Sequence, residues 1–386
     1  MKPSLSFPSF SAGFLAVLVG YTSSIAIVLQ AAQSAGASAT QLNSAMLVLG
    51  VGVGAGTILL SLLTRVPILL AWSTPGAALL ATSLHQYSYA EAIGIFIFAS
   101  ALMVLVGVSG LFHRFSRWIP PHLAAAMLAG ILVHFGIALF NVDKSAQLLV
   151  GVMLLAYLIV RWVWPRLAII ATLTAGILFL SIQGAWHSEA ISWHWAVPAW
   201  QSPVWNSSAL LGVGLPLFLV TLSSQNLPGV AMIQSFGYQP RLSPIITATG
   251  LLGVVLAPFG GFAYNLAAIS AALCLSPEAD PNPQQRYKAA VFAGGLYILC
   301  GLLGATIIGI FYVLPAPFIT ALAGIALIST LSQSFASAFE KESQRESTLF
   351  TFLVTASGLS FFNVGSAFWG LVLGLLIHYA RPRTSA

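Results

Sequence analysis

Long apolar runs separated by short polar stretches fill this chain, and the length of each run predicts its structure. A membrane-spanning helix needs about 20 predominantly apolar residues. Runs of this kind lie near 12–31, 42–63, 67–84, 91–112, 120–140, 145–161 and 166–183. After a polar connector at 184–207, further runs lie near 208–233, 243–257, 259–275, 287–311, 316–338, 347–361 and 364–380. The pattern predicts an all-α membrane protein with fourteen transmembrane segments, seven in residues 1–183 and seven in 208–386.

The third and tenth segments are interrupted at matching positions in the two halves. Each begins as an extended apolar run, passes through polar or glycine residues and continues as a short small-residue helix. The residues at the two breaks are Ser73, Thr74, Pro75 and Gly76 in the third segment, and Phe262, Tyr264, Asn265 and Leu266 in the tenth. Paired interrupted segments in a membrane protein point to a transport site.

These breaks suit an anion. If each half-helix begins near the bilayer midplane, its free N–H groups and positive dipole end face the opposite half. Two such ends form an anion site without a buried Lys or Arg, and neither broken segment contains a cation. Ser73, Thr74 and Asn265 are expected to cap the half-helices, with ligand binding as a second role. Phe262, Tyr264 and Trp72 either pack as ordinary apolar side chains or stack on an aromatic ligand.

Composition places the chain in a membrane, because 58% of its residues are hydrophobic and only 6% are charged. Short cytoplasmic loops collect Lys and Arg, so the fourteen-segment pattern can be checked by charge. With a cytoplasmic N-terminus, one side receives Lys2, Arg65, Arg114, Arg117, Arg161, Arg166, Arg241, Arg286, Lys288, Lys341, Arg345, Arg381 and Arg383, and the other receives Lys144. This bias predicts two cytoplasmic termini, a periplasmic connector and inverted halves. It also explains the net charge of +6 without nucleic acid.

Polar residues within other segments are further site candidates, because polar groups in a bilayer are costly. The first segment contains Tyr21, Ser24 and Gln30, and the eighth contains Gln225 and Asn226 before a Pro-Gly pair expected to kink or end the helix. Buried Ser and Thr can instead bond to their own helix backbone.

The fifth segment contains one mid-membrane histidine, His134. It is either a proton carrier or a side chain satisfied by a neighbour.

Enzyme chemistry has no support in the chain. There is no HExxH or GxSxG motif, and the carboxylates fall in loops or at segment ends. Cys274 and Cys300 show neither metal-ligand spacing nor a disulfide framework. No enzyme activity, metal or cofactor is therefore expected.

Four motifs carry a resemblance to a known family: Gly20-Tyr21-Thr22-Ser23-Ser24, Trp72-Ser73-Thr74-Pro75-Gly76, Gln225-Asn226-Leu227-Pro228-Gly229 and Gly260-Gly261-Phe262-Ala263-Tyr264-Asn265. Over essentially the whole chain they resemble the benzoate/proton symporter (BenE) family, which is similar in plan to uracil and xanthine permeases and to sulfate-type anion transporters. The resemblance implies a bacterial inner-membrane protein with inverted repeats of seven segments and short strands in segments three and ten. It also implies a core of segments 1–4 and 8–11 moving against a gate of segments 5–7 and 12–14 in an elevator mechanism, often in a homodimer.

One departure bears on the substrate. Nucleobase permeases of this plan carry glutamates in segments eight and ten, where this chain has Gln225 and Tyr264. A glutamate would repel a carboxylate ligand, so its absence favours an anion over a nucleobase. The residues at the breaks therefore suit a small aromatic carboxylate, and the resemblance names benzoate and implies that a proton is taken up with it. A nucleobase permease and an uncoupled small-anion transporter or channel stay as alternatives.

Overall fold

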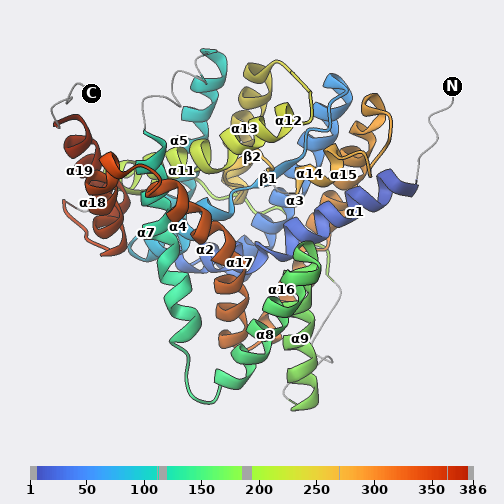
Figure 1. Cartoon of the computed structure of the whole chain (residues 1–386), viewed down its shortest axis with the longest axis horizontal. Coiled ribbons are helices and arrows are strands. Elements are labelled where there is room, and N and C mark those ends of the chain that lie inside the picture. Colours follow the sequence, from blue (N-terminus) through green and yellow to red (C-terminus); the bar gives the residue numbers. More distant parts are fainter. Residues whose placement is uncertain are drawn as a thin grey trace.

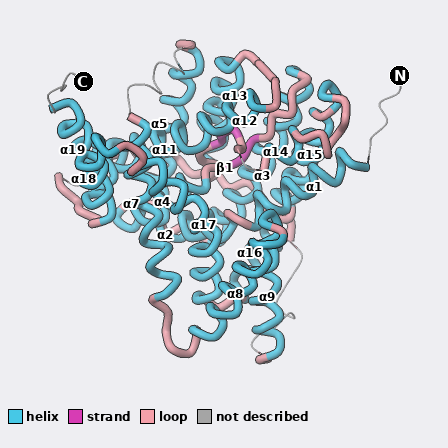
Figure 2. The backbone as a smooth tube through the Cα atoms, viewed as in Figure 1, coloured by secondary structure: helices cyan, strands magenta, loops and turns pink. Residues whose placement is uncertain are grey.

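Two short strands lie at the centre of the molecule with helices around them, as Figures 1 and 2 show. This computed structural model describes residues 7–110, 112, 120–184, 194–268, 270–362 and 364–380. Strand β1 (Leu70–Trp72) comes from the first half of the chain and β2 (Tyr264–Leu266) from the second. They pair antiparallel, with Ala71 opposite Asn265. We call these six residues the strand crossing.

The helices of the first half follow the predicted apolar runs. They are α1 (Phe7–Thr22), α2 (Ile25–Ser34), α3 (Ala39–Thr64), α4 (Thr74–Ser83), α5 (Tyr89–Val108), α7 (Pro121–Phe140), α8 (Gln147–Val163) and α9 (Ala168–Ile182). Short 3-10 turns occupy Leu84–Gln86 (η1) and Pro165–Leu167 (η2). The first predicted segment is therefore two helices, separated at Ser23 and Ser24.

The second half follows its runs in the same way, with two π-helical turns in its first segment. These are η4 (Leu210–Gly214) and η5 (Leu222–Asn226), between α10 (Ser207–Ala209), α11 (Leu215–Thr221) and α12 (Leu227–Ser235). The helices that follow are α13 (Leu242–Leu256), α14 (Ala271–Leu275), α15 (Tyr287–Leu302), α16 (Gly304–Val313), α17 (Ala316–Ala338), α18 (Arg345–Ala356) and α19 (Ser366–Ala380), with 3-10 turns η6 (Ala257–Phe259), η7 (Pro283–Gln285) and η8 (Glu342–Gln344).

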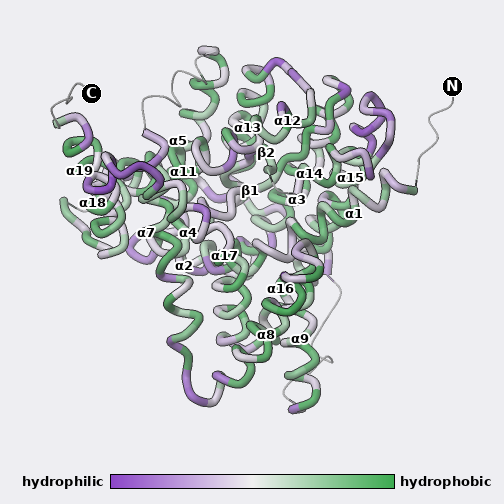
Figure 3. The backbone as a smooth tube through the Cα atoms, in the orientation of Figure 1, coloured by the Kyte–Doolittle hydropathy of each residue, from purple (hydrophilic) through white to green (hydrophobic). Residues whose placement is uncertain are grey.

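Length and apolar composition identify membrane-spanning helices. Within the described residues, seven helical stretches are long and apolar enough, and a bent pair joining η7 and α15 to α16 at 65° makes an eighth. Three shorter apolar helices, α8, α9 and α19, fall below that length. The molecule is thus a polytopic helical membrane protein, whereas the fourteen crossings and the inverted repeat remain predictions. Figure 3 shows hydrophobic residues along α7, α8, α9 and α16, with hydrophilic residues gathered in the connections.

Alternating glycines in α3 allow close packing against α15. A Cβ on Gly50 would lie 2.5 Å from the Gly301 Cα, and one on Gly54 would lie 2.4 Å from the Gly294 carbonyl oxygen. Only glycine lets the two backbones approach this closely, as small residues do in membrane helix pairs. This packing fixes the helix that leads into β1.

The described part of the connector bonds to the start of α5 and to the turn η6 that precedes β2. The Val204 N–H donates to the Ala90 carbonyl at 2.9 Å, and the Gln201 N–H donates to the Pro258 carbonyl at 2.7 Å. Trp195, Trp200 and Trp205 are exposed, as expected for an interfacial aromatic belt. Trp186 and Trp193, which the sequence places in the same belt, lie outside the described residues.

Candidate functional site

Backbone groups in and beside the strand crossing bond to other protein groups. Beyond the paired strands, the Ser73 N–H donates to the Ala263 carbonyl at 3.0 Å, and the Ala267 N–H donates to the Leu69 carbonyl at 2.9 Å. Thr57 of α3 accepts from the Leu70 N–H at 2.9 Å. Irregular backbone at membrane depth requires such internal partners. The crossing is therefore a fixed platform from which α4 begins.

The start of α4 agrees with the sequence prediction for Ser73 but not for Thr74, which is the first residue of the helix and not its cap. Ser73 is its N-cap, and the Ser73 hydroxyl accepts a 2.9 Å hydrogen bond from the Gly76 N–H. Pro75 has no N–H to donate. Ser73, Pro75 and Gly76 are buried, whereas Thr74 is half-buried and its hydroxyl makes no hydrogen bond to the described residues. Thr74 therefore presents the unused polar group at this helix start.

The tenth segment departs from its prediction. Asn265 does not cap a helix, because it lies within β2 and α14 begins only at Ala271. The Asn265 side-chain amide donates to the Ala263 carbonyl, and Ala263 has a left-handed φ of 46°. The expected half-helix starting at Leu266 is wrong, because the Leu266 backbone is engaged in strand pairing and in a bond to Asn226. The site therefore has one capped helix start, at α4, and one strand-lined side, at β2.

Asn226 attaches the π-helical turn η5 to β2. Its side-chain oxygen accepts from the Leu266 N–H at 3.1 Å, and its amide donates to the Asn265 side-chain oxygen at 2.9 Å. Both asparagines are almost fully buried. The helix does not end at Pro228, as the sequence allowed, but continues as α12 to Ser235. The Asn226 amide also donates to the Met103 sulfur at 3.6 Å. The described hydrogen bonds of the Asn226 side chain therefore all go to protein groups and not toward a ligand.

Gln225, the neighbouring amide, is placed differently. It is half-buried, and its side chain makes no hydrogen bond to any described residue. Turn η5 contacts both β2 and α7. Gln225 and Thr74 are therefore two half-buried polar residues, next to β2 and β1 in the fold, whose side chains bond to no described residue.

Trp72 is held by the break between α1 and α2. Its indole N–H donates to the Ser24 hydroxyl at 2.8 Å, and that hydroxyl donates to the Gly20 carbonyl at 2.7 Å. The Trp72 ring packs edge-on against Tyr21 at 5.3 Å and Tyr297 at 5.8 Å. Ser24 and Tyr21 consequently orient Trp72, whose faces are covered by protein. Tyr297 was missed from sequence, although an intramembrane tyrosine is itself a signal.

The two aromatic residues around β2 also contact protein. Tyr264 donates its hydroxyl to the Val48 carbonyl of α3 at 2.7 Å. Phe262 is 3% exposed and its ring lies 5.4 Å from that of Phe96. It borders a narrow apolar cavity next to Tyr89, whose buried hydroxyl has no hydrogen-bond partner among the described residues. Tyr264 therefore anchors the strand crossing, and Phe262 lines this small cavity together with Tyr89 and Phe96.

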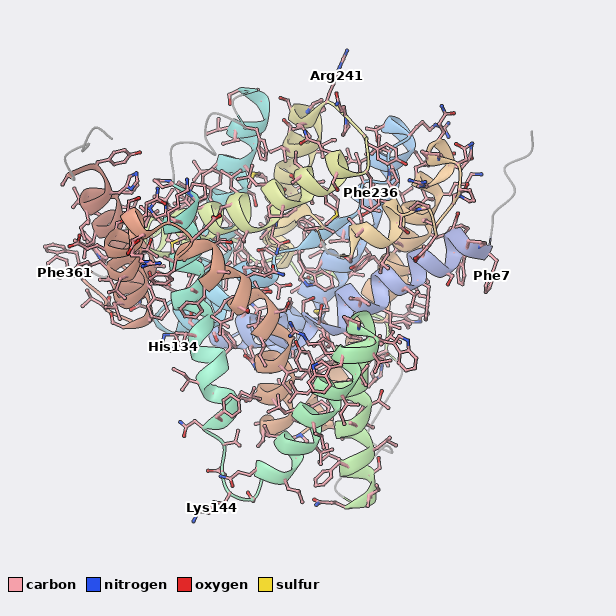
Figure 4. The ribbon with its side chains drawn as sticks, in the orientation of Figure 1. Phe7, His134, Lys144, Phe236, Arg241 and Phe361 are labelled. Carbon is pink, nitrogen blue, oxygen red and sulfur yellow. The ribbon has the colours of Figure 1, made fainter. Side chains whose placement is uncertain are left out.

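The remaining predicted residues lie apart from the crossing. Gln30 is half-buried on α2, and His134 is exposed on α7 (Figure 4). No hydrogen bond connects His134 with the described residues of the strand crossing. Among the described residues no cluster of three or more His, Cys, Asp or Glu could hold a metal. The polar groups available at the crossing are thus neutral donors and acceptors beside an uncharged helix start, an arrangement that can bind an anion.

Comparison with known proteins gives both sequence and fold relatives. The model of a family described as "Benzoate membrane transport protein" matches residues 4–380. The chain is 47% identical over 367 residues to the inner membrane protein YdcO of Escherichia coli (strain K12), covering 95% of this chain and 94% of that protein. It is 36% identical over 387 residues to the benzoate membrane transport protein of Acinetobacter baylyi, covering 100% and 98%.

Solved structures with a similar fold are much more distant in sequence. The transmembrane domain of the cyanobacterial bicarbonate transporter BicA matches with a TM-score of 0.61 and 14% identity, covering 96% of this chain and 98% of that one. The murine solute carrier 26 family member A9 anion transporter, in its inward-facing state, matches with a TM-score of 0.59 and 12% identity, covering 99% and 70%. At such low identity the likeness concerns the fold alone.

Proposed function

Because the chain belongs to the benzoate membrane transport protein (BenE) family, we propose that this membrane transporter carries benzoate or a related small aromatic carboxylate together with a proton. The observation that supports this substrate class is the uncharged strand crossing with free polar groups at Thr74 and Gln225. A carboxylate accepts hydrogen bonds from a hydroxyl and an amide and gains from the positive end of α4. No carboxylate side chain lies in either broken segment to repel it.

In this proposal the predicted site residues divide into ligands and supports. Thr74 and Gln225 contact the carboxylate, and Phe262 faces the aromatic ring. The supports maintain the geometry of the strand crossing; they are Ser73, Pro75, Gly76, Asn226, Tyr264, Asn265 and Leu266. Tyr21 and Ser24 hold Trp72, and Gln30 lies on α2.

The proton travels on the substrate. Carboxylic acids have reference pKa values near 4 and arrive ionised near neutral pH, so the bound carboxylate can itself take up the proton, and the resulting neutral pair needs no protein relay. The exposed position of His134 fits this route better than a relay through α7. Replacing His134 with Gln is then expected to leave the proton-to-benzoate ratio unchanged. A lower ratio would return His134 to the mechanism.

Substrate movement is assigned to a core of residues in segments 1–4 and 8–11 sliding against a gate of segments 5–7 and 12–14. The extensive packing of α3 on α15 and α5 on α13 falls within the core, and that of α7 on α17 and α18 on α19 falls within the gate. We propose a homodimer, periplasmic exposure of the connector and cytoplasmic termini as part of the same arrangement.

Uptake of labelled benzoate into proteoliposomes, with and without an inward proton gradient, tests the function. Vesicles without protein correct for neutral benzoic acid that crosses lipid unaided. Wild type should exceed that leak when the gradient is present, and Gln225→Ala should lower uptake about tenfold, the loss expected for a hydrogen bond to a charged group. Gln147→Ala, an exposed change on α8, serves as the matched control. Uptake equal to empty vesicles would refute benzoate as the substrate.

A small inorganic anion is the second candidate, supported by the fold shared with the BicA transmembrane domain. Competition separates the two substrates. Excess bicarbonate should leave benzoate uptake unchanged if the aromatic ring contributes to binding, and should abolish it if the site recognises small anions in general. Excess uracil tests the nucleobase alternative in the same assay.

A further inference from the structure

An open cavity lies at the end of the molecule opposite Lys144. It measures about 520 Å³ and is lined by Arg65, Tyr238, Pro283, Gln284, Gln285 and Tyr287. These residues come from the end of α3, the loop between α12 and α13, and the start of α15. Arg241, in the same loop as Tyr238, projects from this end in Figure 4. The cavity lies away from the strand crossing and has no part in the proposed transport step.

Arg65 is the charged residue of this lining. Its guanidinium lies 4.9 Å from the centre of the Tyr287 ring and donates to the Tyr287 hydroxyl at 2.5 Å. None of the described carboxylates forms an ion pair with it. A guanidinium has five N–H donors, so most of them stay free. Stacking on Tyr287 fixes the plane of the guanidinium. A guanidinium in a fixed plane can bind a phosphate through two parallel hydrogen bonds.

The backbone at Arg65 adds a second observation. Arg65 ends α3 in the left-handed region, with φ 57°. Glycine or asparagine fits this helix-end position with less strain. An arginine there carries a conformational cost while placing its side chain over Tyr287 and into the cavity.

The remaining lining supplies neutral donors. Gln284 is exposed and Gln285 is half-buried, and neither side-chain amide makes a hydrogen bond to the described residues. Burial raises the pKa of Tyr238, which keeps its hydroxyl protonated and donating to the Pro283 carbonyl at 2.6 Å. Arg286 adds positive charge next to the cavity while its own donors bond the carbonyls of Leu275 and Asp280.

An apolar strip leads from Arg65 along the membrane-facing side of α3. Leu59, Leu62 and Leu63 are 57%, 45% and 72% exposed. Their spacing of three and four residues puts them on one helix face. In a membrane protein such a face contacts acyl chains, and a cation at its end lies at headgroup level.

We propose that this cavity binds the headgroup of an anionic phospholipid. Arg65 pairs with the phosphate, Gln284 and Gln285 donate to the headgroup oxygens, and an acyl chain lies along Leu59, Leu62 and Leu63. Arg65, which forms no ion pair with a described carboxylate, favours a negatively charged ligand. The exposed leucines beside it favour a lipid over free phosphate.

Thermal unfolding of the purified full-length protein in an uncharged detergent tests this site. Dihexanoylphosphatidylglycerol, dihexanoylphosphatidylcholine and glycerol 3-phosphate are titrated separately. We expect the phosphatidylglycerol to raise the unfolding midpoint of wild type and the other two probes to have little effect. Arg65→Gln should require about fivefold more phosphatidylglycerol, the loss expected for one cation near a headgroup.

Two further variants complete the test. Arg345→Gln removes an exposed arginine that pairs with Glu342, and it should respond as wild type does. Gln284→Ala is an exposed change that removes no side-chain hydrogen bond to the described residues. It should weaken the response to a smaller extent, and it keeps the test decisive if Arg65→Gln does not fold. Equal responses to phosphatidylcholine and phosphatidylglycerol would overturn the proposal, as would an unchanged response in both Arg65→Gln and Gln284→Ala. An equal effect of glycerol 3-phosphate would assign the cavity to a free phosphate and overturn the lipid.

Discussion

At the scale of single residues, two adjacent amides have different tasks. Gln225 and Asn226 look alike in the sequence, and the cost of polar groups in a membrane marks both. Consecutive side chains on a helical turn point in different directions, and in the π-helical turn η5 the side chain of Asn226 bonds to β2 whereas that of Gln225 does not. The sequence could not identify the partners of Asn226, because they are Asn265 and Leu266 on a distant strand.

These two positions give a paired prediction. Asn226→Ala leaves the buried Leu266 N–H without an acceptor and should lower the free energy of unfolding by about 1–3 kcal/mol. Gln225→Ala removes no side-chain hydrogen bond to the described residues, so it should leave stability unchanged while lowering benzoate uptake. Unfolding in detergent and uptake in proteoliposomes measure the two effects separately. Equal loss of stability in both variants would contradict the assignment.

The α4 start gives a second pair. Ser73→Ala removes the cap bond to the Gly76 N–H and should lower the free energy of unfolding by about 1 kcal/mol. Thr74→Val keeps the side-chain volume but removes a hydroxyl free of protein partners, so it should raise the benzoate concentration for half-maximal uptake without changing the unfolding midpoint. If Thr74→Val transports as wild type does, Thr74 is not a ligand.

At the scale of elements, the sequence predicted where the third and tenth segments are interrupted better than it predicted where the helices after the interruptions begin. The extended run before Ser73 and the cap at α4 follow from local residue types, and both are confirmed. The start of α14 was predicted too early, because the alanine-rich run after Asn265 has high helix propensity. Tertiary contacts override it: the Ala267 N–H bonds to Leu69, on the other half of the chain.

The contact between α3 and α15 tests whether close packing supports the crossing. Gly54→Ala would place a Cβ against the Gly294 backbone and should lower the free energy of unfolding by about 1–3 kcal/mol. Gly151→Ala on α8 is the control, because no atom of the described residues lies within 4 Å of its added Cβ. Equal unfolding midpoints would show that the helices separate at little cost.

At the scale of the whole molecule, the charge pattern predicts orientation. Lys144 lies at one extremity and Arg241 at the other (Figure 4), and positive residues collect on the cytoplasmic side. A Lys144→Cys variant should therefore react with a membrane-impermeant maleimide added to intact cells, and Arg241→Cys should react only after lysis. Wild type, whose Cys274 is buried and Cys300 half-buried, corrects for background. The reverse labelling pattern would invert the topology.

The joining of β1 to β2 also has a consequence for biosynthesis. β1 is synthesised long before its partner, which lies in the other half of the chain. At about 5–20 residues per second, the backbone of β1 waits on the order of 10–40 s for residues 264–266 to emerge. An unpaired strand is costly within a bilayer, so the ribosome must complete most of the chain before its first half can finish folding. Residues 1–183 expressed alone should be degraded, and co-expression of residues 184–386 should rescue them.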